Sequence, residues 1–82
     1  MSDPDLTRQI QAFIVEEFLF GEGNVAPDDD LFETGVVDSL GFMRLLAYMD
    51  RTFGVQVAMA DIVMENFNTA HKVAAYVTTH RN

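Results

Sequence analysis

The sequence contains no cysteine, which excludes disulfide bonds and thiolate metal ligands. Basic residues are also scarce: five Lys and Arg stand against 13 Asp and Glu, and the formal net charge is -8. A chain this acidic repels nucleic acid and anionic membrane surfaces, so we expect no nucleic-acid partner. Basic protein surfaces are the partners that such a charge favours, although acidity often serves solubility alone.

Long hydrophobic runs are absent as well. No apolar stretch approaches the length of a membrane span, so we expect no membrane insertion. Residues 1–20 carry four acidic groups and no basic leader segment, which argues against a secretory signal and favours a cytoplasmic protein. Glycine and proline are few, and no tract has low complexity. We therefore expect residues 1–82 to fold as a single domain and to act as a monomer.

Hydrophobic periodicity predicts a helix at the beginning of the chain. This first helix begins at Pro4, a residue suited to the first helical position, and runs to about residue 19. Residues 24–38 show no period and predict a long loop. The apolar pair Leu31 and Phe32 in this loop is expected to attach it to the core, so the loop should be ordered.

The rest of the chain predicts three more helices. The second begins at Asp38 or Ser39, and its apolar stripe, which we expect in the core, consists of Leu45, Met49 and Phe53. A short third helix is predicted over residues 60–65, and a fourth follows a cap at Asn68 or Thr69. The predicted fold is all-α: a four-helix bundle with a long first loop and a short third helix.

Ser39 stands at the start of the second helix without an evident activating group. A serine nucleophile needs a base within hydrogen-bond reach, but the two histidines, His71 and His80, belong to the last helix and the tail. The Gly-x-Ser-x-Gly motif is absent, because Val37 occupies the place of its first glycine. We therefore do not expect an enzyme. The simplest structural interpretation is that Ser39 caps the helix.

The run LFETGVVDSL, residues 31–40, gives Ser39 a different interpretation. Together with the size, acidity and helix order, its Asp38-Ser39-Leu40 signature resembles the acyl carrier and peptidyl carrier protein family. The resemblance implies that a phosphopantetheinyl transferase attaches 4'-phosphopantetheine to Ser39. It also implies that the thiol of this arm carries acyl or aminoacyl groups as thioesters, and that Asp38 and Leu40 flank the attachment point. The transferase would supply the base that the chain lacks.

The second helix departs from the pattern of fatty-acid carriers. In those carriers it bears acidic residues that meet basic partners, whereas here Arg44 and Arg51 occupy such positions and only Asp50 is acidic. With Met43 and Ala47, the two arginines form the face expected to meet partner enzymes. The resemblance is closer to stand-alone aminoacyl and D-alanyl carriers. It implies a specialised pathway, an adenylating ligase that loads the arm, and downstream acyl-transferring or condensing enzymes.

A competing interpretation is an unmodified helical module that docks partners through the second helix, with a surface made by Leu40, Met43, Leu46 and Ala47.

The acidic run at residues 28–30 lacks the alternation and the glycine of an EF-hand loop, so no metal site is predicted. The five methionines are expected to fill the core, with a pliable wall that admits a bound chain as the alternative.

Overall fold

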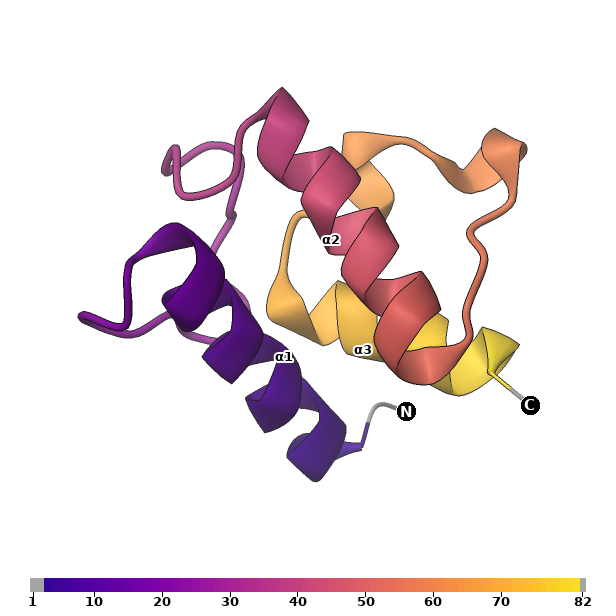
Figure 1. Cartoon of the computed structure of the whole chain (residues 1–82), viewed down its shortest axis with the longest axis horizontal. Coiled ribbons are helices and arrows are strands. Elements are labelled where there is room, and N and C mark those ends of the chain that lie inside the picture. Colours follow the sequence, from indigo (N-terminus) through magenta and orange to yellow (C-terminus); the bar gives the residue numbers. More distant parts are fainter. Residues whose placement is uncertain (1–2, 82) are drawn as a thin grey trace.

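The computed structural model describes residues 3–81, which form three α-helices, two short 3₁₀ turns and no strand (Figure 1). In chain order the elements are α1 Pro4–Phe18, α2 Ser39–Phe53, η1 Met59–Asp61, η2 Met64–Asn66 and α3 Ala70–His80. The all-α prediction is confirmed, but the count of four helices is not. Two 3₁₀ turns take the place of the helix predicted over residues 60–65, because a stretch this short offers too few hydrogen bonds to offset helix nucleation.

The helix termini follow from their capping residues. The Asp3 carboxylate accepts the backbone N–H of Asp5 at 2.9 Å, and Pro4 opens α1 as the sequence predicts. At the start of α3 the Thr69 hydroxyl accepts the N–H of Lys72 at 3.0 Å, so Thr69 rather than its neighbour is the cap.

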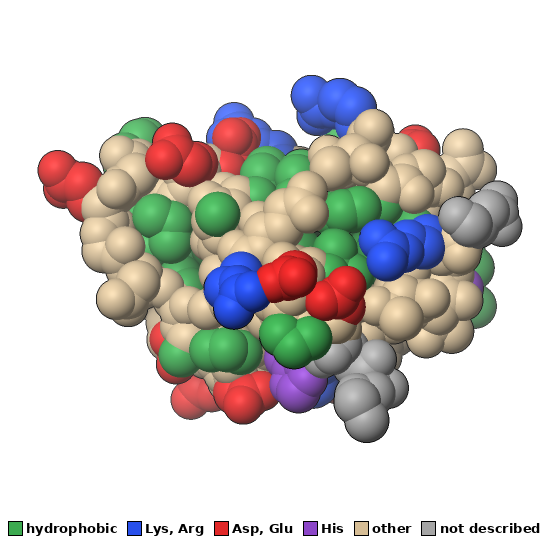
Figure 2. Space-filling view, turned by 90° about the horizontal axis from the view of Figure 1, so that it is seen from below, with side chains coloured by type: hydrophobic (Ala, Val, Ile, Leu, Met, Phe, Trp, Pro, Cys, Tyr) green, Lys and Arg blue, Asp and Glu red, His purple; other side chains and the backbone are tan. Residues whose placement is uncertain are grey.

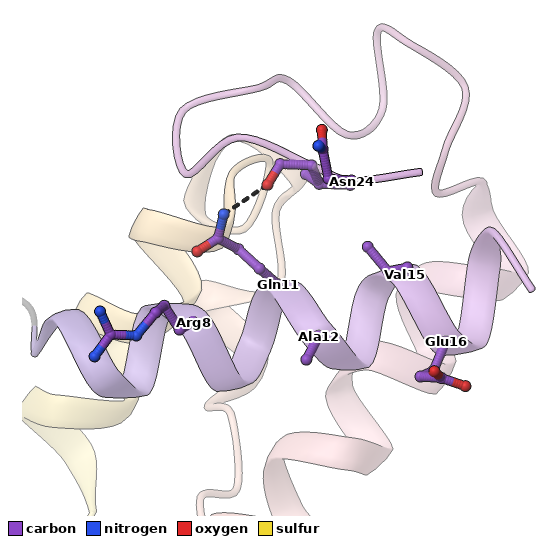
Figure 3. Close-up of a pocket in the computed structure, with 7 residues that line it drawn as sticks. Arg8, Gln11, Ala12, Val15, Glu16 and Asn24 are labelled. Atoms are coloured by element: carbon purple, nitrogen blue, oxygen red, sulfur yellow. Dashed lines mark hydrogen bonds between the residues drawn. The ribbon is translucent and has the colours of Figure 1, made fainter. Parts of the chain in front are cut away.

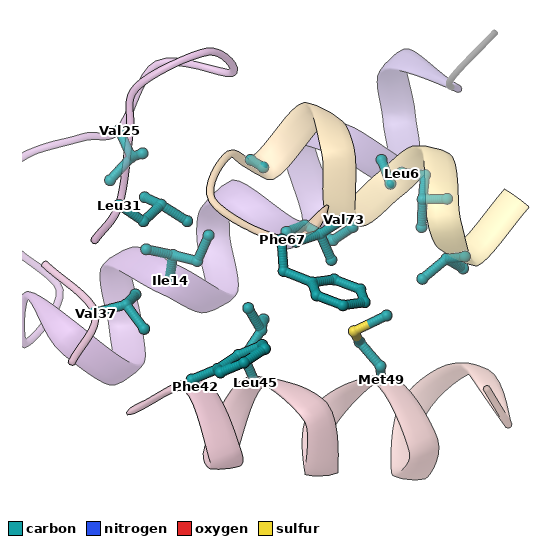
Figure 4. Close-up of a cluster of buried hydrophobic side chains, with 14 of the residues drawn as sticks. Leu6, Ile14, Val25, Leu31, Val37, Phe42, Leu45, Met49, Phe67 and Val73 are labelled. Carbon is teal, nitrogen blue, oxygen red and sulfur yellow. The ribbon is translucent and has the colours of Figure 1, made fainter. Parts of the chain in front are cut away.

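One core joins the three helices (Figure 4). Leu45 and Met49 of α2 are fully buried, as predicted, whereas Phe53 is only partly buried at the end of that stripe. The largest fully buried side chain is Phe67, which stands between η2 and α3 and packs 5.7 Å from the ring of Phe42. The other buried apolar residues are Leu6, Ile10, Ile14, Val25, Leu31, Val37, Val55, Ala70, Val73, Ala74 and Val77.

The long first loop is fixed to the helices on both sides. Leu31 is fully buried, and its N–H donates to the carbonyl oxygen of Asn68 at 2.7 Å, which confirms its predicted anchoring role. The Asn68 amide also donates to Asp30 at 3.1 Å. Nearer α1, the Gln11 side chain donates to the carbonyl oxygen of Val25 at 2.6 Å across a surface hollow (Figure 3). The loop is therefore ordered where it leads into α2.

The surface mixes charged and apolar groups. Figure 2 shows side chains of both charges beside exposed apolar ones on the face seen from below. The large exposed apolar residues are Phe20, Leu40, Met43, Met59, Ile62, Val63 and Met64. The methionines therefore do not fill the core as predicted: within residues 3–81 only Met49 is buried, while Met1 lies outside the described residues. Over the same residues no helix is both long and apolar enough to cross a bilayer.

Candidate functional site

Asp38, and not Ser39, caps α2. The Asp38 backbone is extended, with φ -100° and ψ -171°, and its carboxylate accepts the N–H of Gly41 at 2.7 Å. Its carbonyl oxygen accepts the N–H of Phe42 at 2.8 Å, the first hydrogen bond of the helix. Ser39 is the first helical residue and is exposed. The interpretation of Ser39 as the cap is therefore wrong, and its hydroxyl is accessible from solvent.

The start of α2 also provides a local field that suits an anion. The first N–H groups of a helix have no partner within the helix and form the positive end of its dipole. Asp38 satisfies the N–H of Gly41, which leaves the N–H groups of Ser39 and Leu40 directed out of the helix end. A phosphate ester on the Ser39 oxygen would lie at this end, where such groups are stabilised.

The backbone that presents Ser39 is held from beneath. Val37 is 1% exposed, and its N–H donates to the carbonyl oxygen of Leu31 at 2.9 Å. Gly41 allows α1 to approach closely, since a Cβ at this position would stand 2.8 Å from Cε1 of Phe18. The site therefore combines a rigid support with an exposed hydroxyl.

Neither histidine is arranged as a base for Ser39. His71 Nδ1 lies 3.2 Å from the carboxylate of Asp28, and the backbone N–H of His71 donates to the carbonyl oxygen of Pro27 at 3.0 Å. The His80 ring stacks on Tyr76 with its centroid 3.8 Å away. Within residues 3–81 no three His, Asp or Glu side chains cluster as metal ligands would. The site therefore presents an exposed hydroxyl that neither histidine is placed to activate.

The predicted partner-facing residues divide between two sides of α2. Arg44 and Arg51 line a hollow between α2 and α1, where Arg44 pairs with Glu17 at 3.6 Å. Met43 lines a second hollow on the other side, with Leu46 and Ile62 among its neighbours. Ala47 borders both hollows. Leu40 stands at the top of the helix with 75% of its surface exposed.

Sequence reasoning missed the exposure of three apolar residues that follow the first 3₁₀ turn. Ile62, Val63 and Met64 are 39%, 46% and 43% exposed, and Ile62 lines the same hollow as Met43. The available signal was the lack of helical spacing among apolar residues in this stretch, which the prediction of a short packed helix overlooked. Ile62 therefore adds to the apolar surface beside α2.

Comparisons with known proteins agree with this geometry. Residues 8–77 match the family described as phosphopantetheine attachment site. The chain is similar to the D-alanyl carrier protein of Streptococcus sanguinis (strain SK36), with 33% identity over 69 residues that cover 84% of this chain and 87% of the relative. It is also similar to the D-alanyl carrier protein of Streptococcus suis (strain 05ZYH33), with 33% identity over 64 residues that cover 78% of this chain and 81% of the relative.

Proposed function

We propose, because the chain belongs to the family of phosphopantetheine-attachment carrier proteins, that the Ser39 hydroxyl is the attachment point of the arm. Members of this family carry 4'-phosphopantetheine covalently on a serine and are not enzymes themselves. When bound, the arm supplies a thiol that holds acyl or aminoacyl groups as thioesters. The protein is therefore a carrier that works with a phosphopantetheinyl transferase and a ligase.

The observation that carries the assignment is that Asp38 caps α2 while Ser39 stays exposed. The Ser39 oxygen bonds to the phosphorus of the phosphopantetheine phosphate in coenzyme A, and the adenosine bisphosphate half leaves. The hydroxyl proton passes to a base of the transferase, since neither histidine of this chain is arranged to accept it. A phosphodiester on Ser39 would be favoured by the dipole of α2 and by the N–H groups of Ser39 and Leu40.

The cargo that we propose is an amino acid, activated by an adenylating ligase and delivered to an acyl-transferring or condensing enzyme. The support is the similarity to proteins named D-alanyl carrier protein, together with the charge of α2. Arg44 and Arg51 reduce the attraction of this helix for strongly basic partners. A specialised amino-acid pathway therefore fits the surface better than general fatty acid synthesis.

Intact-mass measurement tests the attachment point. The apo protein, incubated with coenzyme A and a broad-specificity phosphopantetheinyl transferase, should gain the mass of one phosphopantetheine group. The Ser39→Ala variant should keep its helical circular dichroism and gain no mass. Thr52→Ala removes an exposed hydroxyl from the same helix and should be modified like the wild type.

Two outcomes would contradict the proposal. Modification that persists in Ser39→Ala would place the arm on another residue. A wild-type protein that gains no mass would favour the unmodified binding module, whose exposed Leu40 and Met43 would then serve a partner alone.

A further inference from the structure

Phe20 adopts a backbone conformation that bulky residues rarely take. Its φ is +56°, and among residues 3–81 it is the one residue other than glycine with a positive φ. It occupies the left-handed position of the turn that ends α1, in which the N–H of Gly21 donates to the carbonyl oxygen of Val15 at 3.0 Å. Glycine is the usual residue at this position, because a Cβ crowds the neighbouring carbonyl. A glycine would therefore form the turn with less strain than this phenylalanine.

The Phe20 side chain does not offset that strain by packing against the core. It is 89% exposed, whereas the neighbouring Phe18 and Leu19 pack against the core. A large apolar group that is both strained and exposed weakens the turn without adding to the hydrophobic core. Backbone outliers of this kind cluster at binding and other functional sites.

The position of Phe20 identifies the end of the protein at which this contact occurs. Phe18, two residues earlier, lies against Gly41 in the first turn of α2, where a Cβ on the glycine would be 2.8 Å from Cε1 of the ring. Figure 1 shows the C-terminal end of α1 and the N-terminal end of α2 at the same end of the bundle. Phe20, which follows the end of α1, therefore lies at the same end of the bundle as Ser39, the first residue of α2.

The groups around Phe20 are acidic. Glu16 and Glu22 are exposed on either side of it in sequence, and Glu17 is exposed as well but pairs with Arg44 of α2. The Glu16 carboxylate folds over the turn, with Oε1 3.5 Å from the place of a Cβ on Gly21. An apolar group bordered by carboxylates is complementary to an apolar pocket bordered by Lys or Arg.

We propose that Phe20 and its flanking glutamates are a second docking point for the phosphopantetheinyl transferase, an inference that rests on the proposed attachment to Ser39. The transferase acts before the arm exists, so it must bring coenzyme A to the hydroxyl itself and cover this end of the molecule. The ligase acts on the thiol at the far end of the arm, so it does not have to cover the first turn of α2. A site for coenzyme A is lined by cations that hold its phosphates, and these cations supply the basic border that the glutamates require.

Phe20→Gly separates docking from folding, because it should preserve or raise thermal stability while it weakens binding to the transferase. The variant relieves the strained turn, so its thermal stability should equal or exceed that of the wild type. With coenzyme A and a broad-specificity phosphopantetheinyl transferase, its KM as the apo protein should rise at least about fivefold at unchanged kcat. Phe20→Tyr keeps the ring and should have a KM close to that of the wild type.

The charge of the docking point is tested by neutralising its border. The double variant Glu16→Gln, Glu22→Gln should raise KM at low salt, and the difference should shrink as salt screens the attraction. Asp5→Asn, in the first turn of α1, removes a charge at the other end of that helix and should leave KM unchanged.

Each result decides the inference. A wild-type KM for Phe20→Gly, or an equal rise in KM for Phe20→Gly and Phe20→Tyr, would overturn the docking role while leaving Ser39 as the attachment point. A wild-type protein that is not modified at Ser39 would overturn both this inference and the proposed function.

Discussion

The ring of Phe18 lies against Gly41, where a Cβ would stand 2.8 Å from Cε1 of that ring. The contact joins the end of α1 to the first turn of α2, two residues after Ser39. Glycine within a helix costs about 1 kcal/mol relative to alanine, so its presence here has a structural reason. That reason is the close approach of the two helices beneath the exposed serine.

Gly41→Ala should destabilise the protein by about 1–2 kcal/mol in spite of the better helix propensity of alanine. The added methyl group must displace the Phe18 ring, which is partly buried and packs edge-on against Phe13. Urea unfolding measures the change. In a Phe18→Ala background this obstacle is gone, so Gly41→Ala should cost less, although the new Cβ would still lie 3.2 Å from Asp38 Oδ1 and from Val37 Cγ1. A wild-type background that tolerates Gly41→Ala would contradict the close contact.

Asp38→Ala should lower the free energy of unfolding by about 1 kcal/mol, because the N–H of Gly41 loses the carboxylate that accepts it at 2.7 Å. Asp38→Asn retains a side-chain oxygen and should recover most of that loss. Ser39→Ala removes no cap and should change stability much less. Equal losses for Asp38→Ala and Ser39→Ala in urea unfolding would mean that both side chains support the helix end.

Phe67→Ala should cost about 3–5 kcal/mol, because this ring is fully buried among the helices. Phe53→Ala should lower the free energy of unfolding by roughly 1–2 kcal/mol, since the Phe53 ring is only partly buried and packs edge-on against Tyr48 at the edge of the core. Urea midpoints compare the two variants. If Phe67→Ala does not fold, Phe67→Leu provides the milder comparison. A larger loss at Phe53 than at Phe67 would contradict the burial pattern.

The long periodic helices could be predicted from the sequence, whereas the segment between α2 and α3 could not. α1 and α2 carry sustained apolar spacing and strong caps, which are local signals. Residues 55–69 have no such period, and their conformation depends on contacts with distant residues. Phe67 is buried because it meets Phe42 and Tyr76, and no local pattern indicates that meeting.

The candidate site, too, could be predicted from the sequence only in part. Asp38 and Ser39 are adjacent and both are good capping residues, so the sequence could not decide which one caps α2. The outcome depends on where the helix begins, and the buried Val37 places the extended residue at Asp38. Ser39 is exposed and does not cap the helix because of that register. The exposure of Phe20 likewise depends on the turn after α1, which helical spacing does not describe.

Tyr76 should make the stability of the protein sensitive to alkaline pH. Burial raises the pKa of its phenol above 10, and a hydrogen bond to the Asp61 carboxylate, 2.9 Å away, raises that pKa further. The folded protein thus holds this proton more tightly than the unfolded chain does. The resulting stability is fully present below pH 10 and is lost as the pH rises through the folded pKa.

Tyr76→Phe removes this titration, so its melting temperature should fall less steeply than that of the wild type above pH 10. A weaker fall should remain, since burial also raises the pKa of Tyr48. Thermal melts from about pH 8 to about pH 11.5, with phenolate absorbance as a second readout, measure both effects. Parallel curves for the two proteins would show that Tyr76 does not contribute.

Arg51→Glu should weaken aminoacyl loading more than Arg44→Glu does, although both residues border the same hollow beside α2. Arg44 already faces Glu17 at 3.6 Å, so part of its charge is compensated within the chain. Both arginines are exposed, and each reversal should change the free energy of unfolding by less than about 0.5 kcal/mol.

The proposed ligase would meet the arginine charge with a carboxylate, so reversal should lower kcat/KM through the association rate and most strongly at low salt. The measurement is loading of the phosphopantetheine-bearing protein by an adenylating aminoacyl ligase across a salt series. Identical kcat/KM values for both variants and the wild type at every ionic strength would show that this face of α2 does not select the partner.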